Sequence, residues 1–480
     1  MNVELELLVA RLRWPVGCAR WWAMQELALL LVSPEHQSQV SDRLIGELTA
    51  CKLEAEAVEL MSIFWIAQKQ GWVARPDLGA AVSRPSMLTD RLLADMGLEA
   101  TSNIVPPLAT LPRDYEIPEE FERRQGRDVP RIHHTLASDL EERTGMPFLH
   151  QMAYEWEQSK AAYPDAPLQG DLSYFVRPAG DHGAGSFADR TSLRMLTAFI
   201  RTMEVARTLW RAPDRFAFNL ARRAIPLEPT FAFLRPSRPV WLPTLCRDSG
   251  FDAASVARFV VEAIAGLKAL DGAGALLALS TPMHVSGSEL IELTVVRWRR
   301  WGAKAIDPAE LWSRYEARQH MAFGTFDSAE WGLKSQISSL PLREVLDRET
   351  GAAPMAALFG IGRIGYLQRD LFPSRLYLPV VSGLKDELLA EPADGAVVIS
   401  APGGLVASLG YWGAGWSACY PAGNSGLVGT ALVGRLNAPL GEGEEPPDGH
   451  FYLWRLSKLK RENGYGRYEQ GASIVGIVEG

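Results

Sequence analysis

The spacing of apolar residues changes once along this chain, near residue 275, and this change restricts the fold more than any other feature. Before it, apolar residues recur at helical intervals, as in the stripe of Leu196, Phe199 and Met203. After it, runs such as ALLALS at 275–280 are typical of strands. The sequence therefore predicts an α+β, multidomain protein with a helical N-terminal half, a mixed middle and a β-rich C-terminal module.

Shifts in composition divide the chain into five parts. These are a helical repeat-like domain (1–75), a proline-rich connector (76–130), a mainly helical domain (131–272), a mixed α/β segment (273–395) and a β-rich C-terminal module (396–480). The acidic stretch NAPLGEGEEPPDG at 437–449 interrupts the last part. We expect this stretch to be exposed and open to proteolysis.

Three helix starts carry clear local signals. Ser33-Pro34 offers an N-cap followed by a first-turn proline. Asp252 precedes an amphipathic segment that ends before Gly272, and Asp307-Pro308 opens a further helix with the pattern of a capping box. We therefore expect helices to begin at these three positions.

Residues 4–72 resemble HEAT or armadillo repeats, with a plain helical bundle as the alternative. A proline stands near the start of a helix in RWPVGCARWWAMQELALLL, and two more short apolar-striped segments follow it. Each helix is too short to bury its apolar face alone, so we expect the helices to stack on one another. The resemblance implies a surface built for binding other proteins.

Charge and hydropathy exclude several classes of protein. The chain carries 49 Lys and Arg against 57 Asp and Glu, a net charge of -8, which argues against a polybasic module for nucleic acid or membranes. No run of about 18 uncharged apolar residues is present. The acidic N-terminal stretch also lacks the cationic region of a signal peptide. We expect a cytoplasmic protein without a membrane partner.

Motifs for cofactor and metal chemistry are weak. The GIGRIG at 360–365 matches the glycine pattern of a dinucleotide-binding turn, but no convincing strand precedes it, and Pro373 follows after only about seven residues. The 8 His are scattered, and no HExxH or Cys/His quartet has the spacing of a zinc site. Among the 4 Cys, none lie closer together than Cys18 and Cys51. We therefore expect no cofactor and no metal.

A hydrolase remains the alternative function. The GNSG at 423–426 is similar to the sequence around the nucleophile of trypsin-like serine proteases. Such a nucleophile needs a His base and an acid that orients it, and His284 and Asp327 precede Ser425 in the order that this family uses. The family's second glycine is missing, however, and 307–350 is strongly helical where that fold needs strands.

Tryptophan and arginine point instead to binding. The chain has 15 Trp, a residue that suits interface hot spots. Near residue 300, arginines interleave with Trp, a combination that fits an acidic protein partner or single-stranded nucleic acid, and the net charge favours the protein. The predicted interaction residues are Trp14, Trp21, Trp22, Arg297, Trp298, Arg299, Arg300 and Trp301.

Two N-terminal stretches carry a second resemblance. RLRWPVGCARWWAMQELALLL and LEAEAVELMSIFWIA look like the start of large accessory proteins of bacterial anti-phage systems. Among these is the CRISPR-associated protein cut by a caspase-like peptidase in the single-protein type III effectors, whose fragments act on a partner such as a sigma factor. The resemblance implies a regulatory protein without catalytic residues that is cleaved in an exposed linker, with 382–395 and 437–449 as the candidates. We therefore favour a non-enzymatic protein–protein interaction function.

Overall fold

The structure of the chain is a computed structural model in which two compact units are described. In the described part, the first unit ends at Ala232 and the second begins at Phe233; we call them the helical unit and the sheet unit. The described residues are 2–14, 17–99, 108–124, 132–163, 190–225, 229–235, 237–243, 252–270, 274–286, 288–301, 307–323, 350–355, 361–364, 378–381, 389–401, 404–412, 429–434, 449–460, 462 and 469–480.

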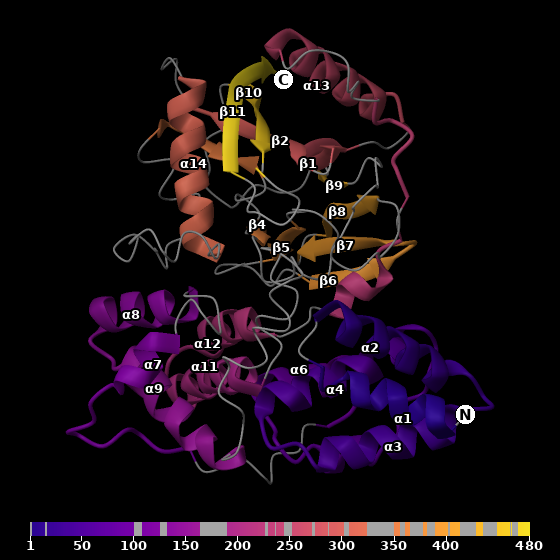
Figure 1. Cartoon of the computed structure of the whole chain (residues 1–480), viewed down its shortest axis with the longest axis vertical. Helices are drawn as coiled ribbons and strands as arrows, with labels where there is room; N and C mark the ends of the chain where they lie inside the picture. The colour runs from indigo at the N-terminus through magenta and orange to yellow at the C-terminus, as the bar shows by residue number, and fades with distance from the viewer. Residues whose placement is uncertain are drawn as a thin grey trace. The chain divides into compact units, whose positions relative to one another are not determined.

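The helical unit contains only helices and their connections among its described residues (Figure 1). They are α1 (Asn2–Arg11), α2 (Gly17–Val32), α3 (Gln37–Thr49), α4 (Glu54–Lys69), α5 (Leu78–Ala81), α6 (Met87–Asp95), α7 (Glu119–Arg124), α8 (Ile132–Thr144), α9 (Phe148–Gln158), η1 (Ser159–Ala162), α11 (Arg190–Thr208), α12 (Asp214–Ala221) and η3 (Arg222–Ala224), with η4 (Pro229–Phe233) at the boundary. None of the described helices combines the length and the apolar character that spanning a bilayer requires.

Helix α11 forms the centre of the helical unit. The predicted stripe is confirmed, because Leu196, Phe199 and Met203 are all buried in one core cluster. The helix contacts α4, α9 and α12, which contribute most of the other members of that cluster. Burial of this stripe against several helices stabilises the amphipathic segment in helical form.

The expected helix start at Ser33 is wrong by one turn. Residues 33–36 form a turn in which the Ser33 carbonyl accepts hydrogen bonds from the N–H groups of His36 (3.0 Å) and Gln37 (2.9 Å), and α3 begins at Gln37. The other two signals are confirmed. The Asp252 carboxylate accepts from the Ser255 N–H (2.8 Å) at the start of α13, and Asp307 accepts from the Ala309 N–H (2.9 Å) at the start of α14.

The sheet unit is built on one antiparallel sheet of 9 described strands with the order β11-β10-β2-β1-β9-β8-β7-β6, to which β3 adds beside β2. Its strands are β1 (Ala275–Ser286), β2 (Glu289–Arg300), β3 (Ala352–Pro354), β6 (Leu389–Ala393), β7 (Ala396–Ala401), β8 (Gly404–Trp412), β9 (Gly429–Gly434), β10 (Gly449–Lys460) and β11 (Glu469–Glu479). A separate pair consists of β4 (Ile361–Ile364) and β5 (Leu378–Val381). The predicted α+β class, helical first and β-rich towards the C-terminus, is therefore confirmed.

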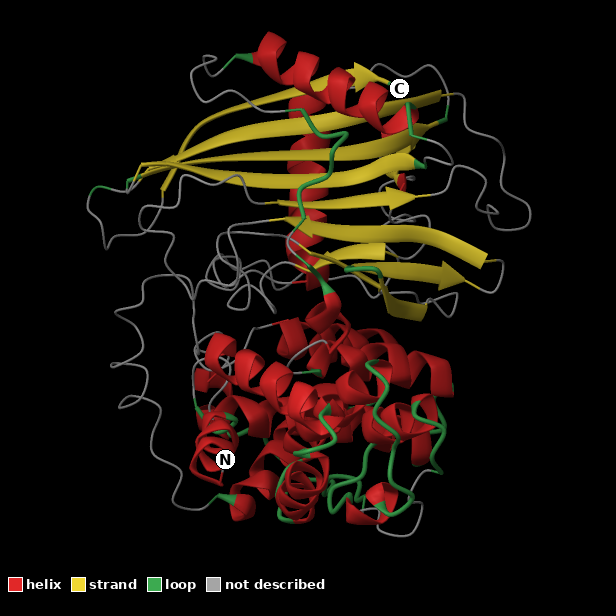
Figure 2. Cartoon of the chain, turned by 90° about the vertical axis from the view of Figure 1, so that its right-hand side faces the viewer, coloured by secondary structure: helices red, strands yellow, loops and turns green. Residues whose placement is uncertain are grey.

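Among the described elements, one helix covers each face of the sheet. Because side chains alternate along a strand, Val295 and Val296 of β2 point to opposite faces. Val295 packs in a cluster with α13 (Ala253–Lys268), and Val296 packs in a second cluster with α14 (Pro308–Phe323). Figure 2 shows α13 in front of the sheet and α14 behind it. Helix α13 thus packs on the sheet, although its residues lie in the stretch 131–272 that the sequence groups with the preceding helices.

Candidate interaction surface and arginine cluster

The paired tryptophans of α2 have opposite environments. Trp21 is 2% exposed, whereas Trp22 is 47% exposed and Trp14, after α1, is 49% exposed. Neighbouring residues on a helix point about 100° apart, so burial of Trp21 in the core turns Trp22 outward. Trp21 is therefore a core residue and not an interaction residue, while Trp14 and Trp22 are available to a partner.

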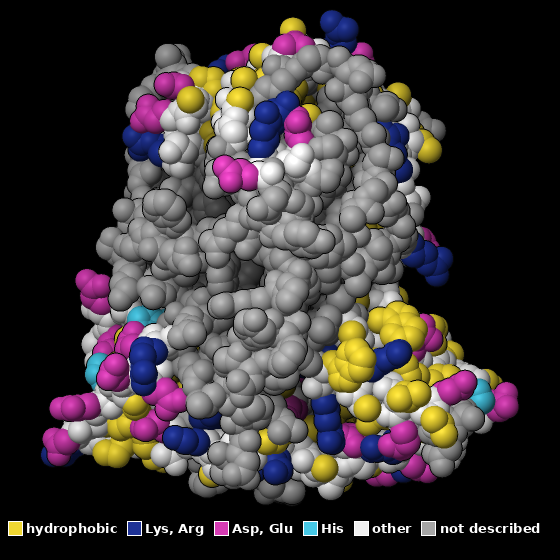
Figure 3. All heavy atoms as spheres, in the orientation of Figure 1, with side chains coloured by type: hydrophobic (Ala, Val, Ile, Leu, Met, Phe, Trp, Pro, Cys, Tyr) yellow, Lys and Arg dark blue, Asp and Glu magenta, His cyan; other side chains and the backbone are white. Residues whose placement is uncertain are grey.

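Further apolar side chains accompany the two exposed tryptophans. Val3 and Leu7, four residues apart on one side of α1, and Leu29, seven residues after Trp22 on α2, are each more than half exposed. Figure 3 shows hydrophobic side chains gathered over α1 and α2. We call Val3, Leu7, Trp14, Trp22 and Leu29, together with Arg11, the α1–α2 surface. A contiguous apolar surface of this kind marks an interaction site more often than single exposed residues do.

A cation lies between the two indole rings of this surface. The guanidinium carbon of Arg11 is 4.8 Å from the ring centroid of Trp22 and 5.9 Å from that of Trp14. Within the described residues Arg11 forms no ion pair, in contrast to Arg13, whose Nη2 lies 2.5 Å from Glu47 Oε2. Cation–π contacts hold the guanidinium in place and leave its N–H edges free for an anionic group.

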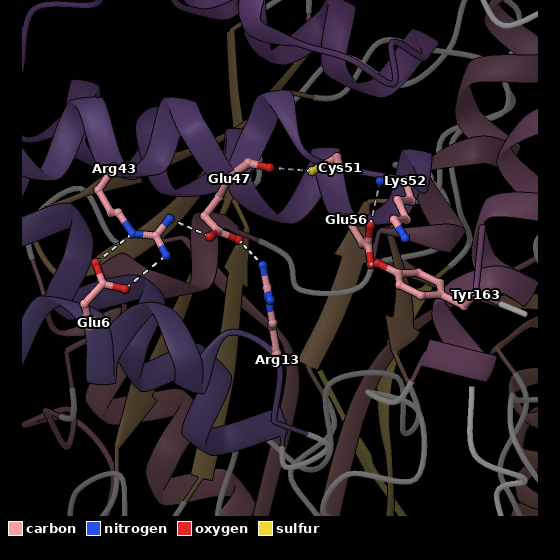
Figure 4. Close-up of polar contacts among 8 residues, drawn as sticks. All are labelled: Glu6, Arg13, Arg43, Glu47, Cys51, Lys52, Glu56 and Tyr163. Atoms are coloured by element: carbon pink, nitrogen blue, oxygen red, sulfur yellow. Dashed lines mark hydrogen bonds and ion pairs between the residues drawn. The ribbon is translucent and has the colours of Figure 1, made fainter. Parts of the chain in front are cut away.

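An ion-pair network fixes α1 against α3 (Figure 4). Arg43 donates from Nε to Glu6 (2.8 Å) and from Nη1 to Glu47 (2.5 Å), and Glu47 also accepts from Arg13. The Arg43 hydrogen bond lowers the pKa of Glu6, and the bonds from Arg43 and Arg13 lower the pKa of Glu47 against the opposing effect of its burial. The network therefore holds the segment that carries Arg11 and Trp14 in one position.

A second set of contacts in Figure 4 fixes the α3–α4 corner. The Glu56 carboxylate accepts from the Lys52 N–H (3.1 Å) and from the hydroxyl of Tyr163, over whose ring the Lys52 ammonium lies at 5.2 Å. The Cys51 thiol donates to the Glu47 carbonyl (3.5 Å), and burial raises its pKa. Burial thus disfavours the thiolate form that a nucleophilic cysteine requires.

Because side chains alternate between the two faces along β2, the predicted basic and aromatic residues near 300 separate into two sets. Trp298 is fully buried on the α14 face, against Phe451 (ring centroids 6.0 Å apart) and Tyr315 (5.4 Å). Arg300 shares this face, crosses above Gly449 and pairs with Glu479 at 3.4 Å. These residues therefore do not form one exposed stacking surface, because a period of two turns every second residue away.

Arg297 and Arg299 lie on the α13 face. Arg297 stands opposite Tyr452 and Arg299 opposite His450 in the register of β2 with β10. Both arginines are buried, Arg297 to 8% exposure, and Arg299 packs on the ring of Trp301 at 4.3 Å. We call Arg297, Arg299 and His450 the arginine cluster.

In the arginine cluster, the buried guanidinium of Arg297 is the group whose charge is not compensated by any described residue. Burial lowers the pKa of His450, and the charges of Arg297 and Arg299 lower it further. The guanidinium of Arg297 lies 5.8 Å from the ring centroid of Tyr452, but within the described part of the chain its buried Nε and Nη1 have no hydrogen-bond acceptor. Such buried, unpaired donors are rare in proteins and call for an explanation.

The hydrolase residues are not brought together by the described part of the chain. The backbone of His284 lies in β1 opposite Leu290, and Asp327 and Ser425 lie outside the described residues. Residues 361–364 of the glycine motif form β4, paired with β5, and its terminal glycines are likewise not described. Among the described side chains, no group of three or more His, Cys, Asp or Glu could hold a metal ion.

Only part of the two expected linkers lies within the described residues. Leu389–Ala393 of the segment 382–395 forms β6, and Asp394 and Gly395, both with positive φ, make the two-residue turn to β7. That half of the segment is therefore a paired hairpin and not a free linker. The second segment, 437–449, lies outside the described residues up to Gly449, where β10 begins.

Sequence reasoning misses two residues of these sites. Arg11 does not belong to any basic run, and only the helical spacing of Val3, Leu7 and Arg11 indicates that they share one side of α1. His450 has no local signal at all, because its proximity to Arg299 depends on a strand pairing across 151 residues. Comparisons of the chain with protein-family models, with curated proteins and with solved structures gave no match.

Proposed function

We propose that the chain is a non-enzymatic interaction protein that binds a protein partner through the α1–α2 surface. The observation that carries the proposal is the guanidinium of Arg11 held between the exposed rings of Trp14 and Trp22. Trp and Arg are the residues most enriched among interface hot spots, where truncation of one side chain costs about 2 kcal/mol or more.

The chemistry of this surface specifies the partner segment. Val3, Leu7 and Leu29 favour an apolar face on the partner, because burying such side chains drives association. Arg11 favours a carboxylate within that face, since a stacked guanidinium can bind a carboxylate through two parallel hydrogen bonds. The partner is therefore a protein segment that combines an apolar side with one acidic residue, and a neutral apolar segment would bind less tightly.

The wider role rests on the sequence resemblances. We propose that α1–α4 act as a HEAT-like platform in a cytoplasmic accessory protein of a bacterial anti-phage system of the CRISPR type, regulated by a cut within 437–449. The stacking of α2 with α3 and of α2 with α4 supports a repeat-like platform. Limited proteolysis of the full chain, with mass spectrometry of the fragments, tests the cleavage site directly. A first cut elsewhere would contradict it.

The binding proposal is tested by purifying the tagged chain from its native host and weighing the intact complexes by native mass spectrometry. We expect one stoichiometric protein partner to copurify with the native sequence. The double variant Trp14→Ala/Trp22→Ala should retain at least tenfold less of that partner. The matched control is Val73→Ala/Val240→Ala, which removes two exposed apolar side chains elsewhere and should leave the complex intact.

Charge reversal then tests the chemistry of the partner. Arg11→Glu should abolish the complex, whereas Arg11→Lys should weaken it, because an ammonium cannot form the two parallel hydrogen bonds. Circular dichroism should show unchanged folding for both variants, since Arg11 forms no ion pair among the described residues. A complex that survives both Trp14→Ala/Trp22→Ala and Arg11→Glu would refute the surface as the binding site.

A further inference from the structure

The buried guanidinium of Arg297 is the strongest unexplained feature of the sheet unit. It is 8% exposed, and none of the described residues supplies an acceptor for its Nε and Nη1 atoms. A guanidinium stays charged inside a protein, and an uncompensated buried charge destabilises the fold. A chain that keeps such a group in its core is built to receive something that compensates it.

The neighbours of Arg297 on this face of the sheet add a second guanidinium and an imidazole. Arg299 lies two residues away on the same face of β2, and His450 stands opposite Arg299 on β10. Tyr452, opposite Arg297, adds a hydroxyl-bearing ring under the guanidinium. The two guanidinium groups on one face of β2 favour an anion that carries more than one charge.

We propose that the arginine cluster is a binding site for a phosphoryl group, either inorganic phosphate or the phosphate of a small monoester. The Nε–H and Nη1–H of Arg297 donate to the phosphoryl oxygens, the charge of Arg299 attracts the dianion, and the neutral imidazole of His450 offers a further hydrogen bond. A carboxylate carries one charge and satisfies the cluster less well. His450 and Trp301 are partly exposed, so the cluster reaches the surface and a ligand can enter beside them.

The site differs from the α1–α2 surface in residues and in unit. It rests on β2 and β10, whereas the proposed protein partner binds helices of the other unit. Failure of one proposal therefore leaves the other unaffected. The two can also be measured separately, since phosphate binding needs no partner protein.

The test is isothermal titration calorimetry of the full chain with inorganic phosphate, adenosine monophosphate and acetate. We expect phosphate or the monophosphate to bind at least tenfold more tightly than acetate, and the tighter of the two identifies the source of the phosphoryl group. Equal affinity for acetate would overturn the preference for a dianion. Absence of heat with both phosphates, together with no shift in melting temperature, would overturn the site.

Variants on one strand localise the binding. Arg297→Met should weaken phosphate binding at least tenfold, and Arg297→Lys should weaken it less. The matched control is Arg300→Met, since this neighbour lies on the opposite face and pairs with Glu479; its affinity should change less than twofold. Loss of binding in Arg300→Met but not in Arg297→Met would place the anion elsewhere and refute the proposal.

Stability without ligand separates a binding role from a structural one. Because the buried Nε and Nη1 of Arg297 have no hydrogen-bond acceptor among the described residues, Arg297→Met should melt at the same or a higher temperature than the native chain in phosphate-free buffer, and it should lose the rise in melting temperature that phosphate gives the native chain. A lower melting temperature without ligand would show that Arg297 supports the fold. Should Arg297→Met fail to fold, Arg297→Lys carries the test, and an unchanged phosphate affinity in Arg297→Lys would overturn the site.

Discussion

The centre of the helical unit contains an arginine between two buried carboxylates, and removing it should unfold that unit at much lower temperature. Arg201 of α11 donates from Nε to Glu155 of α9 (2.6 Å) and from Nη1 to Glu54 of α4 (3.0 Å). The side chains of Glu155 and Glu54 are 1% and 5% exposed, and that of Arg201 is 15% exposed. Arg201→Met keeps most of the apolar stem and leaves both carboxylates without their cation.

The expected cost follows from this burial. Removing one partner of a buried ion pair destabilises a protein by about 3–5 kcal/mol, because the remaining charge stays in a medium that solvates it poorly. With two carboxylates left, we expect the upper part of that range. For a unit of this size each kcal/mol lowers the melting temperature by about 2–4 °C, so the expected shift is about 8–20 °C.

The pH dependence gives the prediction a second signature. Burial raises the pKa of Glu54, and the charge of Arg201 opposes that rise, so loss of the arginine should raise this pKa further. A carboxyl group with a raised pKa in the folded state loses stability as pH increases from its unfolded value through its folded value. The deficit of Arg201→Met should therefore be smaller near about pH 5 than near about pH 8.

Thermal denaturation followed by circular dichroism measures the cost, and hydrogen exchange of α11 locates it. Neutralising both acids in the same background, with Glu54→Gln and Glu155→Gln, should recover more than half of the loss. The control is Arg143→Met, which breaks a more exposed pair with Asp139 (2.8 Å) and should cost about 0.5 kcal/mol or less. A cost below about 1 kcal/mol for Arg201→Met, or no recovery on neutralisation, would refute the reasoning.

Other predictions follow from single residues. Trp21→Ala should cost about 3–5 kcal/mol in denaturant titrations because it empties a core position, whereas Trp22→Ala should change stability by about 0.5 kcal/mol or less. Because the pKa of His450 is lowered on folding, stability should be constant above its unfolded pKa of about 6.5 and fall as pH drops below that value; His450→Gln should flatten this dependence in denaturation midpoints. Gly395→Ala should lower the melting temperature, since φ is +79° and Arg235 crowds the added methyl at 3.0 Å, and a variant as stable as the native chain would contradict that strain.

The sequence predicts local features of this fold well and distant contacts poorly. The stripe on α11 and the caps at Asp252 and Asp307 depend on residues within one or two turns, and all three are found in the structure. The pairing of Arg201 with Glu54 joins positions 147 residues apart, and no spacing in the sequence indicates it.

The same contrast between local features and distant contacts applies to the candidate sites. Exposure of Trp14 and Trp22 agrees with the prediction, but the same reasoning includes Trp21, because adjacent tryptophans cannot be assigned to core or solvent until the helix that buries one of them is known. For Arg297 and Trp298 the prediction is wrong because side chains on a strand alternate with a period of two residues. Interleaved residues on a strand belong to two faces, and the sequence alone does not show that both faces are covered.

The position of β10 has a consequence for any cut at 437–449. This strand pairs along all of its 12 residues with β2 on one side and from Phe451 to Lys460 with β11 on the other, and both β10 and β11 follow the cut. A peptidase that cuts the chain there would thus leave the C-terminal piece bound by backbone hydrogen bonds to β2, as a two-chain complex that survives without the peptide link. Liberation of either piece would need a further step that peels β10 from β2, such as pulling by an unfoldase or capture by a competing strand. Cleavage here would therefore be only the first of two steps. Separation of β10 from β2 would be the slower step and would set the rate at which the pieces are released.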